Sequence, residues 1–207
     1  VDIVLLRLDL EESDDITGPR EEAPIILQEV RDRALIFKDE EYIGTIYRND
    51  EENSVYMGIP QGGAQLDVLV ENMGRINYGP EMPDRKGVTK GIRFDYQYLY
   101  NWEIYTIELE TIADIPFEKG IEQDGPAFYL GEFKVDEPAD TFLALPGWTK
   151  GVCFINGFNL GRYWEVGPTK TLYVPAPLLR KGQNEVVVFE LHGMKKPEIE
   201  FKDQPQL

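Results

Sequence analysis

Residues 147–164 read GWTKGVCFINGFNLGRYW, and this stretch decides the fold. Its apolar run Gly151–Ile155 is followed directly by Asn156-Gly157 and then by a second run that contains three aromatic residues. Asn-Gly tolerates the positive φ angles of a tight turn, so it is the strongest short-range signal for a β-hairpin. The stretch therefore predicts two antiparallel strands joined at residues 156–157.

Short strands are expected along the rest of the chain as well. In Val4–Leu10, large apolar residues recur at every second position, a period typical of a strand with one buried face. Only Ala176–Arg180 suits a single helical turn. We expect strands at residues 4–10, 25–30, 34–37, 42–47, 54–59, 66–70, 91–94, 102–109, 129–135, 141–145, 151–155, 170–174 and 185–191. Many short strands separated by turns predict an all-β fold of the sandwich or jelly-roll type.

The chain also resembles itself. Ala34–Gly44 and Gly151–Gly161 share an apolar strand that ends in an aromatic residue, a turn with Asp or Asn, and a large apolar residue before Gly. Downstream of each, an apolar strand runs into a glycine, in Leu66–Gly74 and in Glu185–Gly193. The repeat predicts two β-sandwiches with a common wiring.

We place the first sandwich at residues 1–99 and the second at residues 100–207, with Asp95–Asn101 as the hinge. The stretch Trp102–Leu109 has the pattern of a strand that suits either sheet, so it leaves the boundary open by about ten residues.

Charge and hydropathy exclude several classes of function. The 21 Lys and Arg residues are outnumbered by 38 Asp and Glu residues, which gives a net charge of −17. A surface this negative repels nucleic-acid phosphates and anionic lipid head groups. The longest apolar runs, such as Val186–Phe189, are too short for a membrane span or a signal-peptide core. We expect no nucleic-acid partner and no membrane partner.

The cellular compartment is indicated only by what the sequence lacks. Cys153 is the only cysteine, and no Asn-x-Ser/Thr sequon occurs. Both observations favour a reducing, cytoplasmic environment. The chain begins at Val1 rather than Met, so we expect its native N-terminus, with any targeting signal, to be missing.

The motifs point to a known family. Residues 147–164, together with Thr171–Pro175, closely resemble the C-terminal galactose-binding-like jelly roll of glycoside hydrolase family 35 β-galactosidases, in which G-W-x-K-G-x-x-x-(I/V)-N-G-x-N-L-G-R-Y-W is a signature. The first half resembles the preceding β-domain of these enzymes through DRALIF at 32–37 and LVENMGRINYG at 69–79. The resemblance implies two tandem galactose-binding-like jelly-roll β-sandwiches over nearly the whole chain.

The same resemblance implies that these residues do not carry the chemistry. Enzymes of this family catalyse their reaction in an N-terminal (β/α)₈ barrel. Two glutamates carry the catalysis, and one of them lies in an E-N-E-(Y/F)-G segment. The nearest string here, Glu71-Asn72-Met73-Gly74, lacks the second glutamate. We therefore expect a non-catalytic C-terminal β-domain pair that braces the barrel of a retaining enzyme acting on terminal β-D-galactosides, with no catalytic residue and no cofactor. Self-association as a homo-oligomer is left open.

Tyr78 is the residue expected to touch substrate. In the family, the loop after this strand leans towards the barrel mouth, and its aromatic ring can face the sugar on the leaving-group side. Aromatic faces pack against the C–H face of a pyranose, so a tyrosine here would help to select the aglycone. Packing between domains is the competing interpretation.

A second set of candidates for sugar or domain docking comprises Trp148, Asn156, Asn159, Arg162 and Trp164. Amides and a guanidinium hydrogen-bond to hydroxyls, while indole rings stack on sugars. A free-standing carbohydrate-binding module with an exposed Trp148–Trp164 pair is thus the alternative function. We prefer a structural role, because Asn-Gly serves the hairpin turn and tryptophans usually anchor cores or interfaces.

No metal site or nucleophile is predicted. The acidic residues between Asp9 and Glu22, which include Glu12, Asp14 and Asp15, lack the spaced ligand-and-glycine pattern of a calcium loop. We expect a solvated loop there, a core role for Cys153, and a strand-end packing role for His192, the only histidine.

Overall fold

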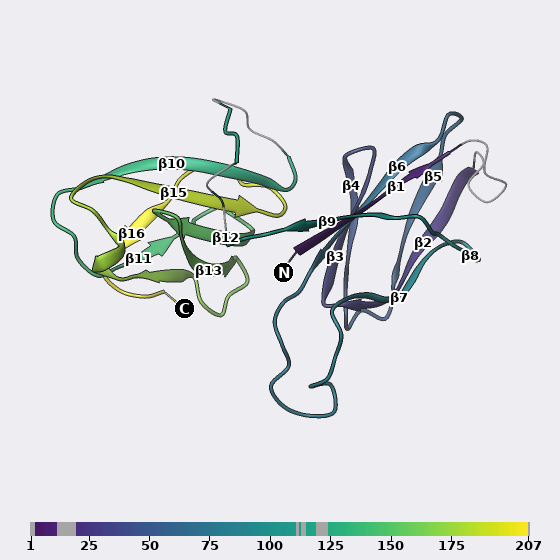
Figure 1. The fold of residues 1–207 in the computed structure, drawn as a ribbon, viewed down its shortest axis with the longest axis horizontal. Helices are drawn as coiled ribbons and strands as arrows, with labels where there is room; N and C mark the ends of the chain where they lie inside the picture. Colours follow the sequence, from purple (N-terminus) through teal and green to yellow (C-terminus); the bar gives the residue numbers. More distant parts are fainter. Residues whose placement is uncertain (1–2, 12–19, 111, 113–114, 119–123, 207) are drawn as a thin grey trace. The chain divides into compact units, whose positions relative to one another are not determined.

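The computed structural model describes residues 3–11, 20–110, 112, 115–118 and 124–206. The described residues form β-strands and one 3₁₀ turn, η1 (Ala176–Leu178), which confirms the predicted all-β class (Figure 1). The chain divides into two compact units, Val1–Leu109 and Glu110–Leu207. Within the described ranges, no helix is long and apolar enough to span a membrane.

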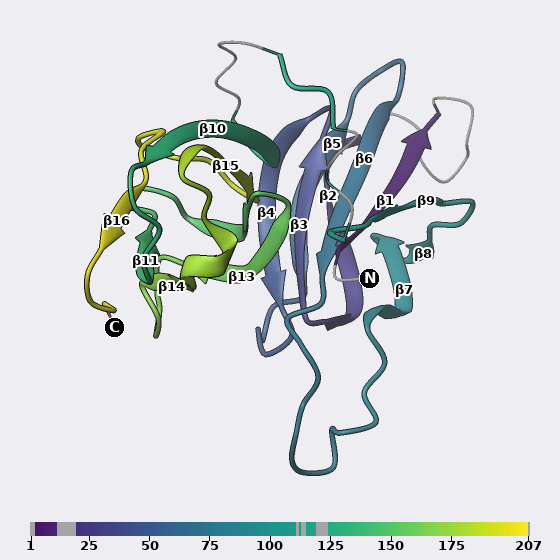
Figure 2. The same ribbon diagram turned by 60° about the vertical axis from the view of Figure 1, so that its left-hand side comes forward.

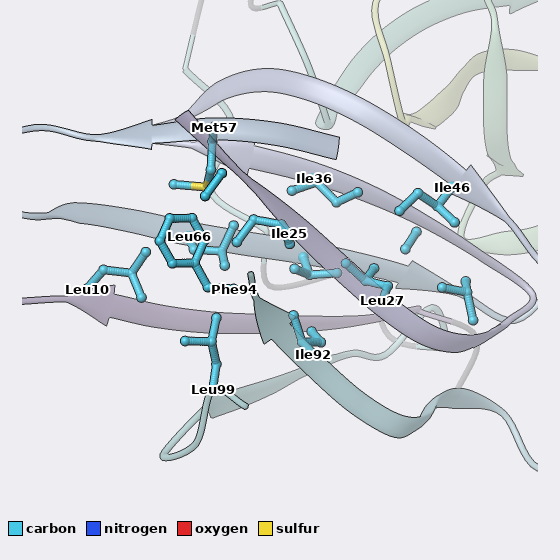
Figure 3. Close-up of a cluster of buried hydrophobic side chains, with 14 of the residues drawn as sticks. Leu10, Ile25, Leu27, Ile36, Ile46, Met57, Leu66, Ile92, Phe94 and Leu99 are labelled. Carbon is cyan, nitrogen blue, oxygen red and sulfur yellow. The ribbon is translucent and has the colours of Figure 1, made fainter. Parts of the chain in front are cut away.

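The first unit contains two antiparallel sheets, with strand orders β4-β3-β6-β1-β9 and β5-β2-β7-β8. Its strands are β1 (Ile3–Leu10), β2 (Arg20–Arg31), β3 (Arg33–Lys38), β4 (Glu41–Tyr47), β5 (Ser54–Ile59), β6 (Ala64–Glu71), β7 (Gly87–Phe94), β8 (Gln97–Tyr98) and β9 (Glu103–Ile107). Side chains from both sheets form one buried cluster, in which Ile36 and Leu66 of the larger sheet meet Ile25 and Phe94 of the smaller one (Figure 3). This shared core makes the unit a β-sandwich.

The second unit is a sandwich of the same kind, with strand orders β10-β15-β12-β13 and β14-β11-β16. Its strands are β10 (Ala127–Val135), β11 (Thr141–Ala144), β12 (Lys150–Ile155), β13 (Phe158–Trp164), β14 (Thr171–Val174), β15 (Gly182–Glu190) and β16 (Glu200–Lys202). Leu143 and Val174 of the smaller sheet pack with Cys153 and Val188 of the larger one in a single buried cluster.

The division between the units falls ten residues later than the sequence-based boundary at residue 99. β9 pairs in antiparallel register with β1, from Ile3 opposite Ile107 to Arg7 opposite Glu103. Trp102 packs against the core of the first unit. Residues 100–109 therefore complete the first sandwich instead of opening the second.

The predicted hairpin is present. β12 and β13 are joined by Asn156 and Gly157, which have φ angles of 49° and 83°. Every strand range expected from the sequence overlaps an observed strand. The strands that were not expected, β8 and β16, contain only two and three residues, too few to show an alternating pattern.

The internal repeat extends to irregular details of the backbone. In the hairpin of the first unit, Gly44 lies opposite Ile36 and Tyr42 lies opposite Phe37, so one extra residue bulges just before the glycine. The hairpin of the second unit has the same bulge just before Gly161. In each unit, the first hairpin strand also pairs with the closing strand, β3 with β6 and β12 with β15.

Candidate functional site

Tyr78 lies on the loop between β6 and β7, which spans residues 72–86. This loop extends away from the strands of the first unit in both ribbon views (Figure 1 and Figure 2). The Tyr78 side chain is 88% exposed. Two turns shape the tip of the loop, closed by the Met82 amide on the Gly79 carbonyl (3.3 Å) and the Asp84 amide on the Glu81 carbonyl (3.1 Å).

The two ends of this loop are tied to one buried carboxylate. Asp32, which is 4% exposed, accepts hydrogen bonds through Oδ2 from the Met73 amide (2.9 Å) and from Lys86 Nζ (2.6 Å). Its other oxygen, Oδ1, accepts one from Arg48 Nη1 (2.6 Å). Met73 and Lys86 lie at opposite ends of the loop, so Asp32 holds the ends together.

A second carboxylate anchors the loop nearer its tip. Asp84 Oδ2 accepts from Arg48 Nη2 at 2.6 Å and pairs with Arg31 Nε at 3.1 Å. Arg48 thereby bridges the two acids with one planar guanidinium, a geometry that lysine does not offer. The loop is thus attached to the sandwich on both sides of Tyr78, at Met73 before it and at Asp84 and Lys86 after it.

The charges of this network favour its ionised form. Burial opposes ionisation of Asp32, but hydrogen bonds from Lys86, the Met73 amide and Arg48 outweigh burial and hold its pKa below the ordinary value. The pKa of Asp84 is lowered in the same way, where desolvation is outweighed by Arg48 and Arg31. The anchor is therefore strongest when both carboxylates are deprotonated.

Asn156, a candidate for sugar binding, is used within the fold. Its Nδ2 donates to the Leu178 carbonyl (2.7 Å) and to Asn184 Oδ1 (2.8 Å), and its Oδ1 accepts from the Glu185 amide (3.0 Å). These bonds tie the hairpin turn to η1 and to the closing strand. The structural interpretation of Asn156 accounts for all of them.

Asn159 and Arg162 lie on the exposed part of β13. Asn159 Oδ1 accepts from the Gly161 amide at 2.8 Å, which closes the backbone around the bulge. Arg162 is exposed and lies opposite Val152 in the hairpin register. Tyr78 belongs to the first unit, whereas Asn159 and Arg162 belong to the second.

Trp148 and Trp164 do not form the exposed pair that the alternative function, a carbohydrate-binding module, would use. Trp148 is 4% exposed; its indole N–H donates to the Glu198 carbonyl (2.8 Å), and its ring meets Tyr129 edge-on. Trp164 is half-buried, with the Lys150 ammonium 4.7 Å from its ring centroid. Both tryptophans border a cavity of about 490 Å³, but Trp148 serves mainly as a core residue.

The cation–aromatic pair at Trp164 is half of a repeated arrangement that sequence reasoning missed. In the second unit, the buried Glu190 accepts from the Lys150 amide (3.2 Å) and from the Tyr163 hydroxyl (2.8 Å), while Lys150 faces Trp164 across the hairpin. Burial, reinforced by the charge of Glu190, raises the pKa of Tyr163. Gly151 is required here, since a Cβ would lie 1.8 Å from the Phe189 carbonyl oxygen.

The first unit has the matching trio at the same place in its hairpin. Arg33 pairs with Glu71 (Nη1 to Oε2, 3.1 Å), and its guanidinium carbon lies 5.3 Å from the Tyr47 ring centroid. Arg33 lies opposite Tyr47, as Lys150 lies opposite Trp164. The signal was in the sequence: a cation at the start of each first hairpin strand and a glutamate at the end of each closing strand.

The buried carboxylates among the described residues serve structure. They are Asp32, Asp67, Glu71 and Glu190, and each accepts hydrogen bonds from cations, amides or a hydroxyl as an internal tie; Asp67, for example, takes a bidentate pair from Arg7 at 2.8 and 2.7 Å. Burial raises the pKa of the Cys153 thiol to about 12, consistent with a core residue. No cluster of His, Cys, Asp and Glu among the described residues could hold a metal ion, and Glu12, Asp14 and Asp15 lie outside them.

Comparison with known proteins assigns both units. Residues 7–108 match the first all-beta domain of beta-galactosidase, and residues 126–184 match the galactose-binding domain of beta-galactosidase. Human beta-galactosidase-1-like protein 2 is 38% identical over 195 residues, which cover 88% of this chain and 30% of the relative. The beta-galactosidase of Xanthomonas manihotis is 40% identical over 160 residues, which cover 77% of this chain and 27% of the relative.

A third relative, the beta-galactosidase of Bos taurus, is 37% identical over 210 residues, which cover 86% of this chain and 32% of the relative. The chain thus spans about 30% of the length of these relatives. Among solved structures, the apo form of a Pleurotus ostreatus lectin aligns over 93% of this chain and 68% of its own with a TM-score of 0.29 and 8% identity. The chain belongs to the β-galactosidase family. It matches two domains of these proteins, the first all-β domain and the galactose-binding domain.

Proposed function

We propose that this chain is the non-catalytic β-domain pair of a β-galactosidase whose catalytic domain hydrolyses terminal β-D-galactosides. Family membership supports the proposal, as does the use of the buried carboxylates as internal ties. A retaining glycosidase needs two carboxyl groups about 5 to 5.5 Å apart across the scissile bond. In the β-galactosidase, that pair belongs to the (β/α)₈ barrel, and this chain supplies shape around it.

The more specific role that we assign is to hold loop 72–86 at the substrate entrance of the barrel, where Tyr78 contacts the aglycone. The single observation that carries this role is an exposed tyrosine on a loop that is anchored by Asp32 and Asp84. An anchored loop loses little entropy when a ligand binds. A phenol ring offers a flat face to sugar C–H groups and a hydroxyl to sugar oxygens.

Steady-state kinetics of the full-length enzyme test this role. With lactose, Tyr78→Ala should raise KM about fivefold to tenfold with a smaller change in kcat, because the ring contributes binding away from the reacting bond. Tyr78→Phe should stay within about threefold of the wild type, since the ring is kept. Tyr56→Ala, which removes an exposed tyrosine from β5, is the matched control. Unchanged kinetics in Tyr78→Ala would contradict the role of the loop.

A further inference from the structure

A row of tyrosines follows β7 in the first unit and is not used by the proposed function. Tyr96, Tyr98 and Tyr100 occupy alternate positions and are 85%, 41% and 68% exposed. The Tyr98 and Tyr100 rings are 6.3 Å apart between centroids and tilted by 40°. Tyr98 belongs to β8, the edge strand of the smaller sheet (Figure 1).

The Tyr98 ring is held in place at both ends. At Gly91, which has a φ angle of 124°, a Cβ would lie 3.1 Å from Tyr98 Cε1, so the ring packs against the bare backbone of β7. The Tyr98 hydroxyl donates to Gln28 Oε1 on β2 at 2.7 Å. A ring fixed in this way loses little freedom when a ligand stacks on it, which favours binding.

Hydrogen-bond donors lie beside this ring on the same face of the sheet. Arg93 is directly opposite Tyr98 in the β7–β8 register. Its neighbours Ile92 and Phe94 are buried in the core, so Arg93 faces outward. Arg93 Nε is buried, and among the described residues it has no hydrogen-bond partner.

The chemistry of this face matches a saccharide. A guanidinium and a side-chain amide donate to sugar hydroxyls, and the tyrosine ring covers an apolar sugar face. The net charge of −17 works against polyanionic ligands. A neutral ligand with many hydroxyl groups meets both conditions.

We propose that Tyr98, Arg93 and Gln28, with Tyr100 at the edge, form a binding site for a neutral saccharide on the outer face of the β5-β2-β7-β8 sheet. The site is separate from the Tyr78 loop and goes beyond the proposed function. Only the choice of galactosides as probes rests on family membership. Its role would be to retain a glycan near the enzyme while the catalytic domain acts on another part of it.

Titration of the 207-residue chain with lactose, followed by amide chemical shifts, tests the site. We expect saturation in the millimolar range, the weak end of specific binding. Arg93→Met and Tyr98→Ala should each weaken binding about fivefold or more, because one removes the donors and the other the ring. Tyr98→Phe keeps the ring and should stay within about twofold, and Tyr56→Ala on the opposite edge strand should bind as the wild type does.

Three results would overturn the proposal. They are no saturation up to about 20 mM lactose, lactose binding that survives both Arg93→Met and Tyr98→Ala, and tighter binding of polygalacturonate than of lactose. Arg93→Met keeps the ring on Gly91, so it decides the matter even if Tyr98→Ala fails to fold. The titration measures binding without turnover and is scored by the Arg93 and Tyr98 variants, which leave Tyr78 unchanged, so its failure is distinguishable from failure of the proposed function.

Discussion

The two units share a hairpin and a closing strand, and they differ in the segment that follows the closing strand. Each has a bulged hairpin, a closing strand, and a buried glutamate beside a cation that faces an aromatic ring. After the closing strand of the second unit, the Thr149 hydroxyl donates to the Gly193 carbonyl at 2.9 Å, and the His192 amide donates to the Glu190 carboxylate at 2.9 Å. After the closing strand of the first unit, the chain runs into loop 72–86, which is anchored by charged groups.

This difference separates what maintains the fold from what we assign to function. Thr149 occupies in the second unit the place that Asp32 occupies in the first, one residue before the cation of the trio. The Thr149 side chain donates one neutral hydrogen bond, whereas Asp32 binds the charged groups of Lys86 and Arg48. The charged residue is found in the unit that has the long loop with Tyr78. The repeated trios stabilise both sandwiches, and the feature that is not repeated marks the candidate site.

The largest expected effect comes from breaking a trio. Glu71→Ala should destabilise the first unit by about 3–5 kcal/mol, because it leaves the buried Arg33 without its carboxylate. Glu190→Ala should destabilise the second unit by about 2–4 kcal/mol, since several buried donors lose their acceptor. Hydrogen exchange resolved by peptide reports each unit separately. The exposed Glu185→Ala, on the same strand as Glu190, should change stability by less than about 0.5 kcal/mol. Equal losses in Glu185→Ala and Glu190→Ala would contradict the importance of the trios.

The second-largest expected effect comes from the residues that hold the segments after the two closing strands. Asp32→Ala should cost about 2–3 kcal/mol and speed amide exchange throughout loop 72–86, because both loop ends lose their acceptor. Thr149→Ala, the equivalent change in the second unit, should cost only about 1 kcal/mol, the net value of one neutral hydrogen bond. Loop exchange that is unaffected by Asp32→Ala would remove the charged anchor from the account.

The two hairpin turns give a smaller contrast. Asp39 and Asn156 occupy equivalent turn positions, and each accepts one backbone amide, from Gln65 and Glu185. Asn156 alone adds two amide donations, so Asn156→Ala should cost about 2 kcal/mol against about 1 kcal/mol for Asp39→Ala. Urea unfolding of both variants measures the difference. A larger loss in Asp39→Ala would contradict the assignment.

The smallest expected effect is a pH dependence of amide exchange that is confined to loop 72–86. The pKa values of Asp32 and Asp84 are lowered in the folded state, so their stabilisation is complete above the ordinary carboxyl pKa of about 4. It is lost as pH falls through their folded pKa values. Exchange in loop 72–86 should therefore rise, relative to the rest of the first unit, as pH falls from about 5 to about 2. Asp32→Asn should weaken this dependence; an unchanged profile would contradict it.

Local sequence chemistry predicted most of the fold. Asn156-Gly157 located the hairpin, and the repeated pattern predicted the duplicated wiring. The domain boundary was left open by about ten residues, because the alternation in Glu103–Ile107 shows a strand but not the sheet to which it belongs. This strand joins the first unit because it pairs with the free edge of β1. Two strands of two and three residues also carried no pattern to detect.

The candidate site was only partly accessible to sequence reasoning. The loop of Tyr78 was recognised, whereas its anchor was not, because Asp32, Arg48 and Lys86 are brought together only by the register of the strands. Trp148 was considered for sugar docking on residue type alone, and burial against Tyr129 assigns it to the core. Residue type suggests a chemistry, and burial decides whether that chemistry is available.

Incubation of the purified 207-residue chain with a chromogenic β-galactoside is the most direct test of the central claim, that this polypeptide supports catalysis without performing it. We predict release of the chromophore at the rate of buffer alone. Turnover at rates typical of glycosidases, retained through repurification, would contradict the account.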